Sequence, residues 1–361
     1  MTILKREGLI LLSLLAAALG FGLEHEVLAA GRTMALVAAA ALIAAIVLAS
    51  MRVAHHAEIL AEKVGDPYGT MILTLSAVAV EVLILAILIR SETSPTLVRD
   101  TIYSAVMLDI NGILGLAALL GGLKHGEQPY NDDSGKTYGV MILTAMGISM
   151  VVPEFVPAAK WQYYSGFTIL AMIALYTLFL RMQVGTHSYF FSYSYPGKIR
   201  NLSAPHDEKE TPATPSILVI LFGVALIGFL AEIMATFLNA GLEGTGAPIA
   251  VTAFLVAAIS ASPEILTAMR AALANRMQAV VNIAMGASLS TVILTVPVME
   301  AIALYTGQPF IMAMTPVQTV MIAITLIAAA INLNDGETNA IEGMTHFVLF
   351  ATFLMLSTLG L

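Results

Sequence analysis

Residues 68–90 read YGTMILTLSAVAVEVLILAILIR, an apolar run interrupted near its middle by one acidic residue, Glu81. A helix needs about 20 mostly apolar residues to cross a bilayer, and this run is long enough. An ionised carboxylate at that depth is costly unless a proton, a cation or water lies close to it. The run therefore predicts a membrane helix with a functional carboxylate. The simpler interpretation is a protonated Glu81 that only bonds a neighbouring helix.

The rest of the chain repeats this apolar pattern. Of its 361 residues, 58% are hydrophobic and only 11% are charged, whereas soluble domains carry about 25% charged residues. No strand-like alternation accompanies the runs. We expect an all-α polytopic membrane protein of about eleven transmembrane helices. Besides 68–90, the expected spans lie near residues 8–23, 33–52, 98–121, 138–157, 164–183, 215–239, 247–271, 278–303, 311–331 and 342–360.

The basic residues predict how these helices are oriented. With a cytoplasmic N-terminus, twelve of the sixteen Lys and Arg residues fall inside, which is the bias found in membrane proteins. We expect a multi-pass bacterial inner-membrane protein whose C-terminus lies outside, because the number of spans is odd. Lys5 and Arg6 before a short apolar run also resemble a secretory signal peptide, but we expect an uncleaved first helix. The four basic residues expected outside are Arg32, Arg90, Arg99 and Lys160.

A polar stretch divides the chain. Residues 185–214 hold several prolines and the charged segment 206–210, a composition typical of a cytoplasmic linker. We interpret it as a solvated loop, and a cation-sensing role is the alternative. With the first helix, residues 1–30, set aside, five spans lie on each side. An odd number of spans per unit forces 31–184 and 215–361 into opposite orientations, which predicts an inverted repeat.

Short sequence matches support the repeat. Residues 57–60 read AEIL and residues 231–234 read AEIM. Each match is followed by a polar turn and then by a span with one glutamate, Glu81 in the first half and Glu264 in the second. We therefore expect the two glutamates to occupy equivalent places.

The stretch before Glu264 predicts a broken helix. Pro263 has no N–H group, so the carbonyl of Ile259 should lose its helical partner. Broken helices at membrane depth present carbonyls and helix ends to cations. Ser260 and Ser262 add hydroxyl groups, so the stretch offers the hard oxygen ligands that Ca²⁺ and Na⁺ prefer.

Two buried glutamates predict exchange, because a proton and a cation compete for the same carboxylate. We expect Glu81 and Glu264 to be the cation, or metal, ligands of an antiporter that moves Ca²⁺, Na⁺ or K⁺ against H⁺ by alternating access. A cation channel or an uncoupled carrier is the alternative. We expect no cofactor and no enzymatic activity.

Other polar residues lie at similar depth. Asp109 and Asn111 are in one expected span, and Asn282 and Ser288 are in its counterpart. They are interpreted either as ligands and supports of ligands or as helix-packing positions. Asp109 would add charge to the site or relay protons, and its sequence context does not choose between these roles.

Acidic and histidine residues near span ends are interpreted as polar caps. Glu154 and Glu300 are expected to face water. A denser group, which could instead sense protons or take up cations, consists of His55, His56, Glu58 and Glu62.

Several function classes lack their motifs. The chain has no cysteine, no His-Glu-x-x-His motif, no phosphate-binding loop and no basic run suited to nucleic acid. We expect its partners to be inorganic cations, protons and the lipid bilayer. The oligomeric state and the exchange stoichiometry are left open.

The sequence resembles bacterial members of the calcium/cation–proton exchanger family, within the calcium:cation antiporter superfamily. The resemblance implies a first helix followed by two inverted five-helix units. It also implies one essential glutamate in each unit, at Glu81 and Glu264. The stretches that carry it are 56–85, Arg99-Asp100-Thr101, Asn111-Gly112-Ile113, 121–125, 183–190, Ser262-Pro263-Glu264 and Gly286-Ala287-Ser288.

One departure from the family pattern bears on the ion. Residues 77–81 read AVAVE where the family has a Gly-Asn-Ala-Thr-Glu type of motif. The first repeat therefore lacks an amide and a hydroxyl group beside Glu81. This weakens the implied preference for Ca²⁺ and leaves Na⁺ and K⁺ open.

Overall fold

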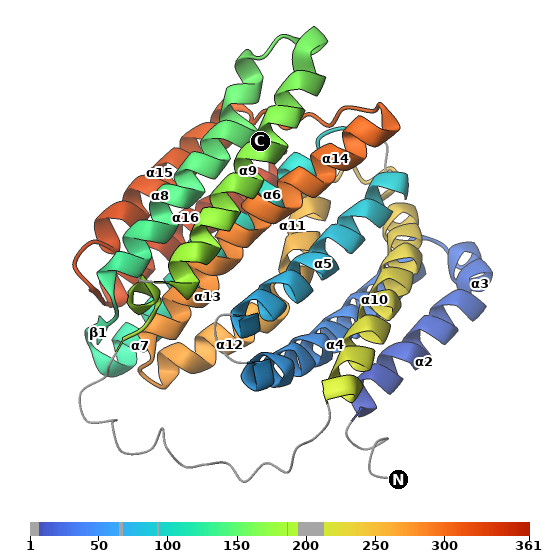
Figure 1. Cartoon of the computed structure of the whole chain (residues 1–361). Coiled ribbons are helices and arrows are strands. Elements are labelled where there is room, and N and C mark those ends of the chain that lie inside the picture. The colour runs from blue at the N-terminus through green and yellow to red at the C-terminus, as the bar shows by residue number, and fades with distance from the viewer. Residues whose placement is uncertain (1–6, 65–67, 92–93, 186, 194–212) are drawn as a thin grey trace.

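The computed structural model describes residues 7–64, 68–91, 94–185, 187–193 and 213–361, shown in Figure 1. Most of the predicted linker, 185–214, lies outside the described residues, as do Lys5 and Arg6. The described chain is almost entirely helical, as its long apolar runs require.

The elements of the first half follow one another along the chain. They are α2 (Gly8–Gly22), α3 (Glu24–Ala29), α4 (Arg32–Val64), α5 (Tyr68–Ser91), α6 (Leu97–Met107), the π-helix η1 (Leu108–Leu114), α7 (Gly115–His125), strand β1 (Gln128–Pro129), α8 (Asp132–Met146), the π-helix η2 (Gly147–Val151), the 3₁₀ turns η3 (Val152–Phe155) and η4 (Ala158–Lys160), α9 (Trp161–Val184) and the 3₁₀ turn η5 (Ser188–Phe191).

The second half has a similar series of elements. They are α10 (Ala213–Leu242), α11 (Ile249–Ser260), α12 (Ser262–Leu273), α13 (Met277–Ser290), the π-helix η6 (Thr291–Thr295), α14 (Val296–Thr306), α15 (Pro316–Asn332), strand β2 (Glu337–Thr338) and α16 (Ala340–Thr358).

The lengths of these helices confirm the all-α polytopic membrane class. Within the described residues, seven continuous helices are long and apolar enough to span a bilayer, and the bent pair α11–α12 would make an eighth. The expected number of eleven also counts three shorter apolar helices and stays a prediction. The three are Gly8–Gly22, Thr74–Ile89 and Pro316–Asn332.

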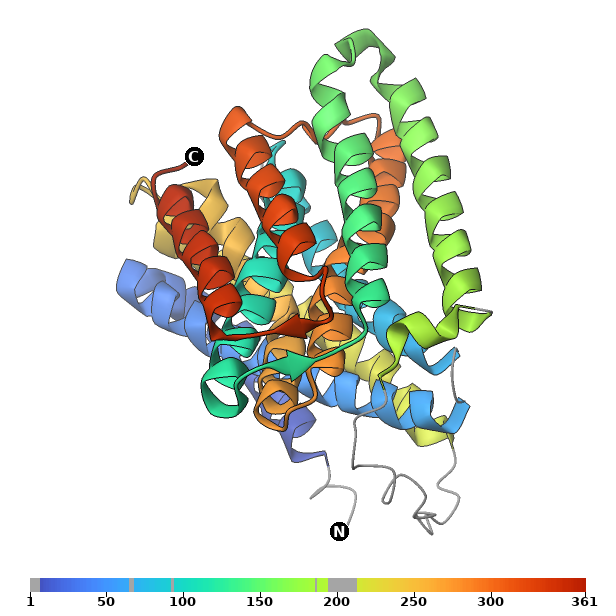
Figure 2. The same ribbon diagram turned by 90° about the vertical axis from the view of Figure 1, so that its left-hand side faces the viewer.

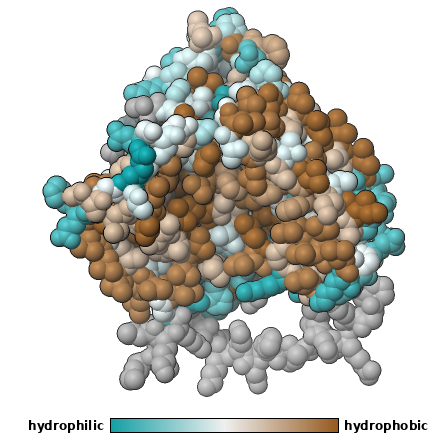
Figure 3. Space-filling view, turned by 180° about the vertical axis from the view of Figure 1, so that it is seen from behind, coloured by the Kyte–Doolittle hydropathy of each residue, from teal (hydrophilic) through white to brown (hydrophobic). Residues whose placement is uncertain are grey.

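The outer surface agrees with a lipid environment. Large apolar side chains on several helices are well exposed, among them Leu15, Phe21, Leu170 and Ile331. Figure 3 shows one face on which such residues form a wide apolar band. A continuous apolar surface of this size is unusual for a protein in water and costs nothing in contact with lipid tails.

The helices form two groups around a shared centre. α4 packs along α10, and α2 packs against both. In Figure 1 these three lie to one side, while Figure 2 shows α16, α15, α8 and α9 as a row on another. Between them lie α5, α6, α11 and α13, with α13 packed directly against η1.

Both central spans contain a π-helical segment. Residues of η1 are all buried within the span Leu97–His125, and those of η6 are nearly all buried within the span Met277–Thr306. A π-segment widens the helix by one residue per turn and is found frequently at functional sites. The two segments bring Asp109 and Thr291 to the middle of the protein.

Candidate functional site

A cavity of about 520 Å³ lies at the centre of the protein. It extends from the C-terminal ends of α4 and α9, where Glu58 and Gln183 line it, to Glu81 on α5. The Glu58 side chain is 52% exposed, so this end is open to the surface. On the span of α13 and η6, no described residue after Thr291 lines the cavity, and on α5 none does after Glu81. The cavity is therefore open at one end and closed beyond Glu81.

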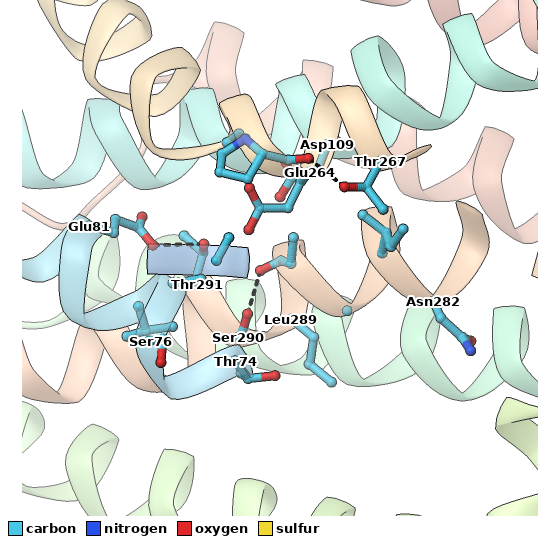
Figure 4. Close-up of a pocket in the computed structure, with 18 of the residues that line it drawn as sticks. Thr74, Ser76, Glu81, Asp109, Glu264, Thr267, Asn282, Leu289, Ser290 and Thr291 are labelled. Carbon is cyan, nitrogen blue, oxygen red and sulfur yellow. Dashed lines mark hydrogen bonds between the residues drawn. The ribbon is translucent and has the colours of Figure 1, made fainter. Parts of the chain in front are cut away.

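Glu81 lies at the closed end of the cavity. Its side chain is only 4% exposed, because α5 packs between α4, α10 and η6. Its Oε2 atom accepts hydrogen bonds from the hydroxyl groups of Thr291 at 3.0 Å and Thr295 at 3.3 Å, and Figure 4 shows the first of these bonds. The Oε1 atom has no hydrogen-bond partner. One oxygen of Glu81 is thus held in place while the other is available to a ligand.

The two threonines replace groups that the first repeat lacks. Residues 77–80 provide no polar side chain beside Glu81. Thr291 and Thr295 are four residues apart, so their hydroxyl groups lie on the same side of η6 and reach Glu81 from the second half of the chain. Sequence reasoning missed both residues, although a Thr-x-x-x-Thr spacing within an apolar span was a visible signal.

Glu264 stands where the helix breaks. α11 ends at Ser260, α12 begins at Ser262, and the two are bent by 59°. Glu264 lies in the first turn of α12, where the unpaired N–H groups of a helix favour negative charge. Its Oε2 atom is buried without a partner. The broken helix predicted around Pro263 is present, and it places the carboxylate on the cavity wall.

The carbonyl of Ile259 differs from the expectation. Pro263 deprives it of its helical N–H partner, as expected, but the carbonyl is not left free for a cation, because it accepts a hydrogen bond from the Ser262 hydroxyl at 2.8 Å. A serine one residue before Pro263 thus supplies a donor in place of the missing N–H group. Ser260 lines the cavity, but its hydroxyl group similarly donates hydrogen bonds to backbone carbonyls, those of Val256 and Ala257.

Asp109 is the third carboxylate in the interior of the cavity, besides Glu81 and Glu264, whereas Glu58 lies at the open end. It lies in η1, is 2% exposed, and accepts a hydrogen bond from the Ser288 hydroxyl at 3.2 Å through Oδ2. Its Oδ1 atom has no partner. Ser288 itself does not line the cavity, so its contact with the site runs through Asp109. Figure 4 shows Asp109 in the same view as Glu81 and Glu264.

The carboxylates of the cavity are not neutralised by basic side chains in the described part of its wall. No lysine, arginine or histidine occurs among the described residues that line it. In the part of the chain that the structure covers, no three His, Asp or Glu side chains converge closely enough to hold a metal ion. Glu81, Asp109 and Glu264 thus share a cavity without forming a closed ligand set.

The two predicted amide residues occupy different places. Asn282 lines the cavity nearer its open end and donates a hydrogen bond to the Phe191 carbonyl. Asn111 is not among the lining residues. Its side chain donates to the Thr325 hydroxyl at 2.7 Å and contacts His346 Nδ1 at 2.9 Å, away from the carboxylates.

The polar residues that were expected near span ends also lie in different places. His56 is buried in contact with Glu7, Arg52 and Ser216, whereas Glu58 lines the cavity. The side chain of Glu62 lies outside the described residues. Glu154 is exposed, as expected.

Glu300 is 4% exposed, so the expectation that it faces water was wrong. It lies near a span end in the sequence, but α14, which carries it, packs against α9, η6 and α5.

Comparison with known proteins gives the family. The model of the sodium/calcium exchanger protein family matches residues 34–185 and 215–359. The chain is 35% identical over 315 residues to the sodium-potassium/proton antiporter ChaA of Escherichia coli, covering 86% of each chain. It is 33% identical to the putative ionic transporter y4hA of Sinorhizobium fredii, covering 84% of each.

Solved structures share the fold. The native YfkE structure superposes with a TM-score of 0.77 at 17% sequence identity, covering 97% of this chain and 99% of that one. The H⁺/Ca²⁺ exchanger CAX superposes with a TM-score of 0.66 at 15% identity, covering 95% and 87%. The two matched segments of the family model fall on either side of the predicted linker and include all three carboxylates. This chain belongs to the sodium/calcium exchanger protein family.

Proposed function

We propose that the protein is an antiporter that exchanges Ca²⁺, Na⁺ or K⁺ for H⁺ across the bacterial inner membrane, with its N-terminus in the cytoplasm. The observation that carries this proposal is a single cavity lined by Glu81, Asp109 and Glu264, with no basic side chain among its described lining residues. The relatives named above as sodium-potassium/proton and H⁺/Ca²⁺ exchangers support cation/proton antiport.

The chemistry of exchange follows from burial. A carboxylate away from bulk water is costly in its ionised form unless a cation or a proton neutralises it. Each of the three carboxylates has one oxygen without a partner, and these oxygens are the places for either ligand. Cation and proton therefore exclude one another at Glu81 and Glu264, which couples their movements. The cation is cargo, and we propose no resident cofactor.

The shape of the cavity favours a carrier over a channel. Its described lining ends at Glu81 and Thr291, so the path is continuous from one side only. A channel needs a path that is open to both sides at once. A carrier needs a second state in which the closed end opens, with the hinge at the break between α11 and α12 before Pro263.

The supporting groups are assigned by their contacts. Asp109 adds a third negative charge, held by Ser288. Ser260 and Asn282 line the route and are within reach of a partly hydrated ion. We place Asn111 in the support of η1, through its bonds to α15 and α16, and not among the ligands.

Transport in proteoliposomes tests the proposal. Vesicles with an acidic interior and a trapped pH dye receive Ca²⁺, Na⁺ or K⁺ separately, with the membrane potential clamped. At least one cation should release protons, and Glu81→Gln and Glu264→Gln should each abolish that release. Glu154→Gln is the matched control, because Glu154 is an exposed acidic residue outside the cavity and should leave the rate unchanged.

Two results would contradict antiport. If folded wild-type protein left the proton gradient intact with every cation, the proposed function would fail. If cations entered the vesicles without any release of protons, a channel or an uncoupled carrier would replace it.

A further inference from the structure

A buried polar cluster outside the cavity joins η1 to α15 and α16. Asn111 of η1 donates a hydrogen bond to the Thr325 hydroxyl at 2.7 Å, and its Oδ1 atom lies 2.9 Å from His346 Nδ1. Asn111 and Thr325 are fully buried, and His346 is 3% exposed. None of the three is among the described residues that line the cavity, so the proposed exchange does not use them as ligands.

The hydrogen-bonding capacity of the Asn111 amide decides which group donates to it. A side-chain amide donates only through nitrogen and accepts only through oxygen. Since Asn111 Nδ2 donates to Thr325, its Oδ1 atom accepts, and His346 supplies the Nδ1–H group. The other ring nitrogen, Nε2, is buried with no partner among the described residues. An apolar residue would avoid this cost, which indicates a role for the Nδ1–H group.

Close packing fixes His346 beside η1. At Gly115, the first residue of α7 after η1, an added Cβ atom would lie only 2.8 Å from His346 Cβ. One turn further along α16, Phe350 packs on Gly112 of η1, where an added Cβ atom would lie 3.2 Å from the ring. Because the two helices approach so closely at these glycines, the His346 ring has a fixed support from which to hold Asn111.

Asp109 and Asn111 leave η1 on nearly opposite sides. Successive residues are turned by about 100° in an α-helix and by somewhat less in a π-helix, so residues two apart face nearly opposite ways. Asp109 lines the cavity, whereas Asn111 contacts α15 and α16. A rotation of η1 about its axis would break the Asn111 hydrogen bonds and turn Asp109 out of its place in the cavity.

We propose that His346 is a positioning residue for the cation site. Its Nδ1–H group holds the Asn111 amide, Asn111 fixes the rotation of η1, and η1 presents the Asp109 carboxylate to the cavity. His346 itself touches neither the cation nor the proton that is exchanged. This inference rests on the proposed antiport, in which Asp109 adds charge to the site.

Thiol labelling at position 109 tests this placement without any transport. The chain has no cysteine, so Asp109→Cys puts a single thiol on the cavity wall, where a small cationic methanethiosulfonate added at the open end should label it. His346→Leu removes the Nδ1–H donor and should slow this labelling several-fold, because the reaction of a thiol depends on its access. His346→Asn places an amide N–H near the position of Nδ1 and should restore most of the rate.

Three further variants show whether the effect is specific. Thr325→Val removes the other partner of Asn111 without a change of shape, so it should also slow the labelling, and it provides the test if His346→Leu does not fold. In Thr74→Cys, on the α5 wall of the cavity, His346→Leu should leave the labelling rate unchanged. Thr352→Val removes an exposed hydroxyl on α16 that bonds its own helix, and it should not affect the Asp109→Cys rate.

The apparent KM for the cation provides a second measurement. In proteoliposomes, His346→Leu should raise this KM several-fold with a smaller change in the maximal rate, and His346→Asn should stay near the wild-type value. In Asp109→Asn protein, His346→Leu should add no further increase, because the carboxylate that it positions is absent.

The labelling results decide the inference. An Asp109→Cys rate that is unchanged or faster in His346→Leu would overturn it. Equal slowing at Thr74→Cys would also overturn it, because the whole cavity would then have loosened. Failure of folded His346→Asn to restore the rate would show that the N–H donor has no part. Wild-type protein that left the proton gradient intact would remove the proposed function, and labelling would still decide whether His346 fixes η1.

Discussion

Three carboxylates and two threonines form the chemical centre of this protein. Glu81 is held by Thr291 and Thr295, while Asp109 is held by Ser288. Each hydrogen bond leaves the second oxygen of the carboxylate free. In the proposed antiport, a carboxylate fixed at one oxygen loses less conformational freedom when a cation binds, so we expect these hydroxyl groups to raise the affinity for the cation.

The hydrogen bond between Thr291 and Glu81 leads to a testable prediction about a single residue. Thr291→Val keeps the shape of the side chain but removes its hydrogen bond to Glu81. Hydrogen bonds to charged groups contribute about 1.5–3 kcal/mol, so we expect the apparent KM for the cation to rise on the order of tenfold. Initial rates of cation-driven proton release against cation concentration measure this change.

The control for this prediction lies on the same span. Thr306→Val removes an exposed hydroxyl that bonds only its own helix, so it should leave the KM unchanged. An unaltered KM in Thr291→Val would show that the bond to Glu81 has no part in cation binding.

Single elements decide how these residues meet. The break between α11 and α12 turns the start of α12, and with it Glu264, toward the cavity. The π-segments η1 and η6 carry Asp109 and Thr291, and both of these residues line the cavity.

The helix break leads to a second prediction. Pro263→Ala restores an N–H group that can bond the Ile259 carbonyl, which favours a continuous helix over the bend. We expect the transport rate to fall several-fold while the thermal unfolding temperature in detergent does not decrease. A variant with the wild-type transport rate would show that the bend does not depend on the proline.

Contacts between elements predict a pH dependence of stability. Glu7, just before α2, forms an ion pair with Arg52 on α4 at 2.6 Å and contacts His56 at 3.1 Å. Burial raises the pKa of Glu7, but the hydrogen bonds from Arg52 and His56 outweigh it, so this pKa lies below the usual 4.5. The pair therefore stabilises the protein above about pH 4.5, and its contribution is lost as the pH falls through the lowered pKa.

Arg52→Gln tests this contact. We expect a loss of about 1 kcal/mol of stability near neutral pH, since the pair is partly exposed. The difference between variant and wild type should stay constant from pH 8 down to about pH 5 and shrink at lower pH. Thermal unfolding in detergent across this range measures it. A difference that persists unchanged below pH 4 would assign the stabilisation to packing of the Arg52 side chain.

At the scale of the whole molecule, the two halves enclose a cavity that is open at one end. The closed end is formed by the later parts of α5 and of the span Met277–Thr306. Alternating access requires that this end open when the first end closes. The chain has no cysteine, so introduced cysteines report on either end without interference.

Labelling with a membrane-impermeant thiol reagent tests this asymmetry. Thr74→Cys places a thiol on the cavity wall, and Ala303→Cys places one beyond the closed end, where Ala303 is 3% exposed. In inside-out vesicles we expect Thr74→Cys to react quickly and Ala303→Cys to react at least about tenfold more slowly, as burial limits thiol reactivity. Equal rates would contradict a closed end, and reaction of Thr74→Cys only from the outside would reverse the orientation.

Much of the protein is predictable from its residues. The apolar runs determine the class, because a backbone in lipid must satisfy its own hydrogen bonds and does so as helices. Glu81 and Glu264 stand out for the same reason, since a charge in such a run is costly. Pro263 predicts a broken helix, because it removes one donor at a known position.

Other features depend on which helices become neighbours. Thr291 and Thr295 bond Glu81 across more than 200 residues of chain, and Asn111 turns away from the carboxylates because α15 and α16 offer it partners. Glu300 is buried although it lies near a span end, since α14 packs against α9, η6 and α5. The sequence alone therefore determined the helical class and singled out Glu81 and Glu264 as candidates, since these follow from the local cost of polar groups in lipid. Only the tertiary structure decided the partners of those groups and the end at which the cavity is closed, since these depend on contacts between distant spans.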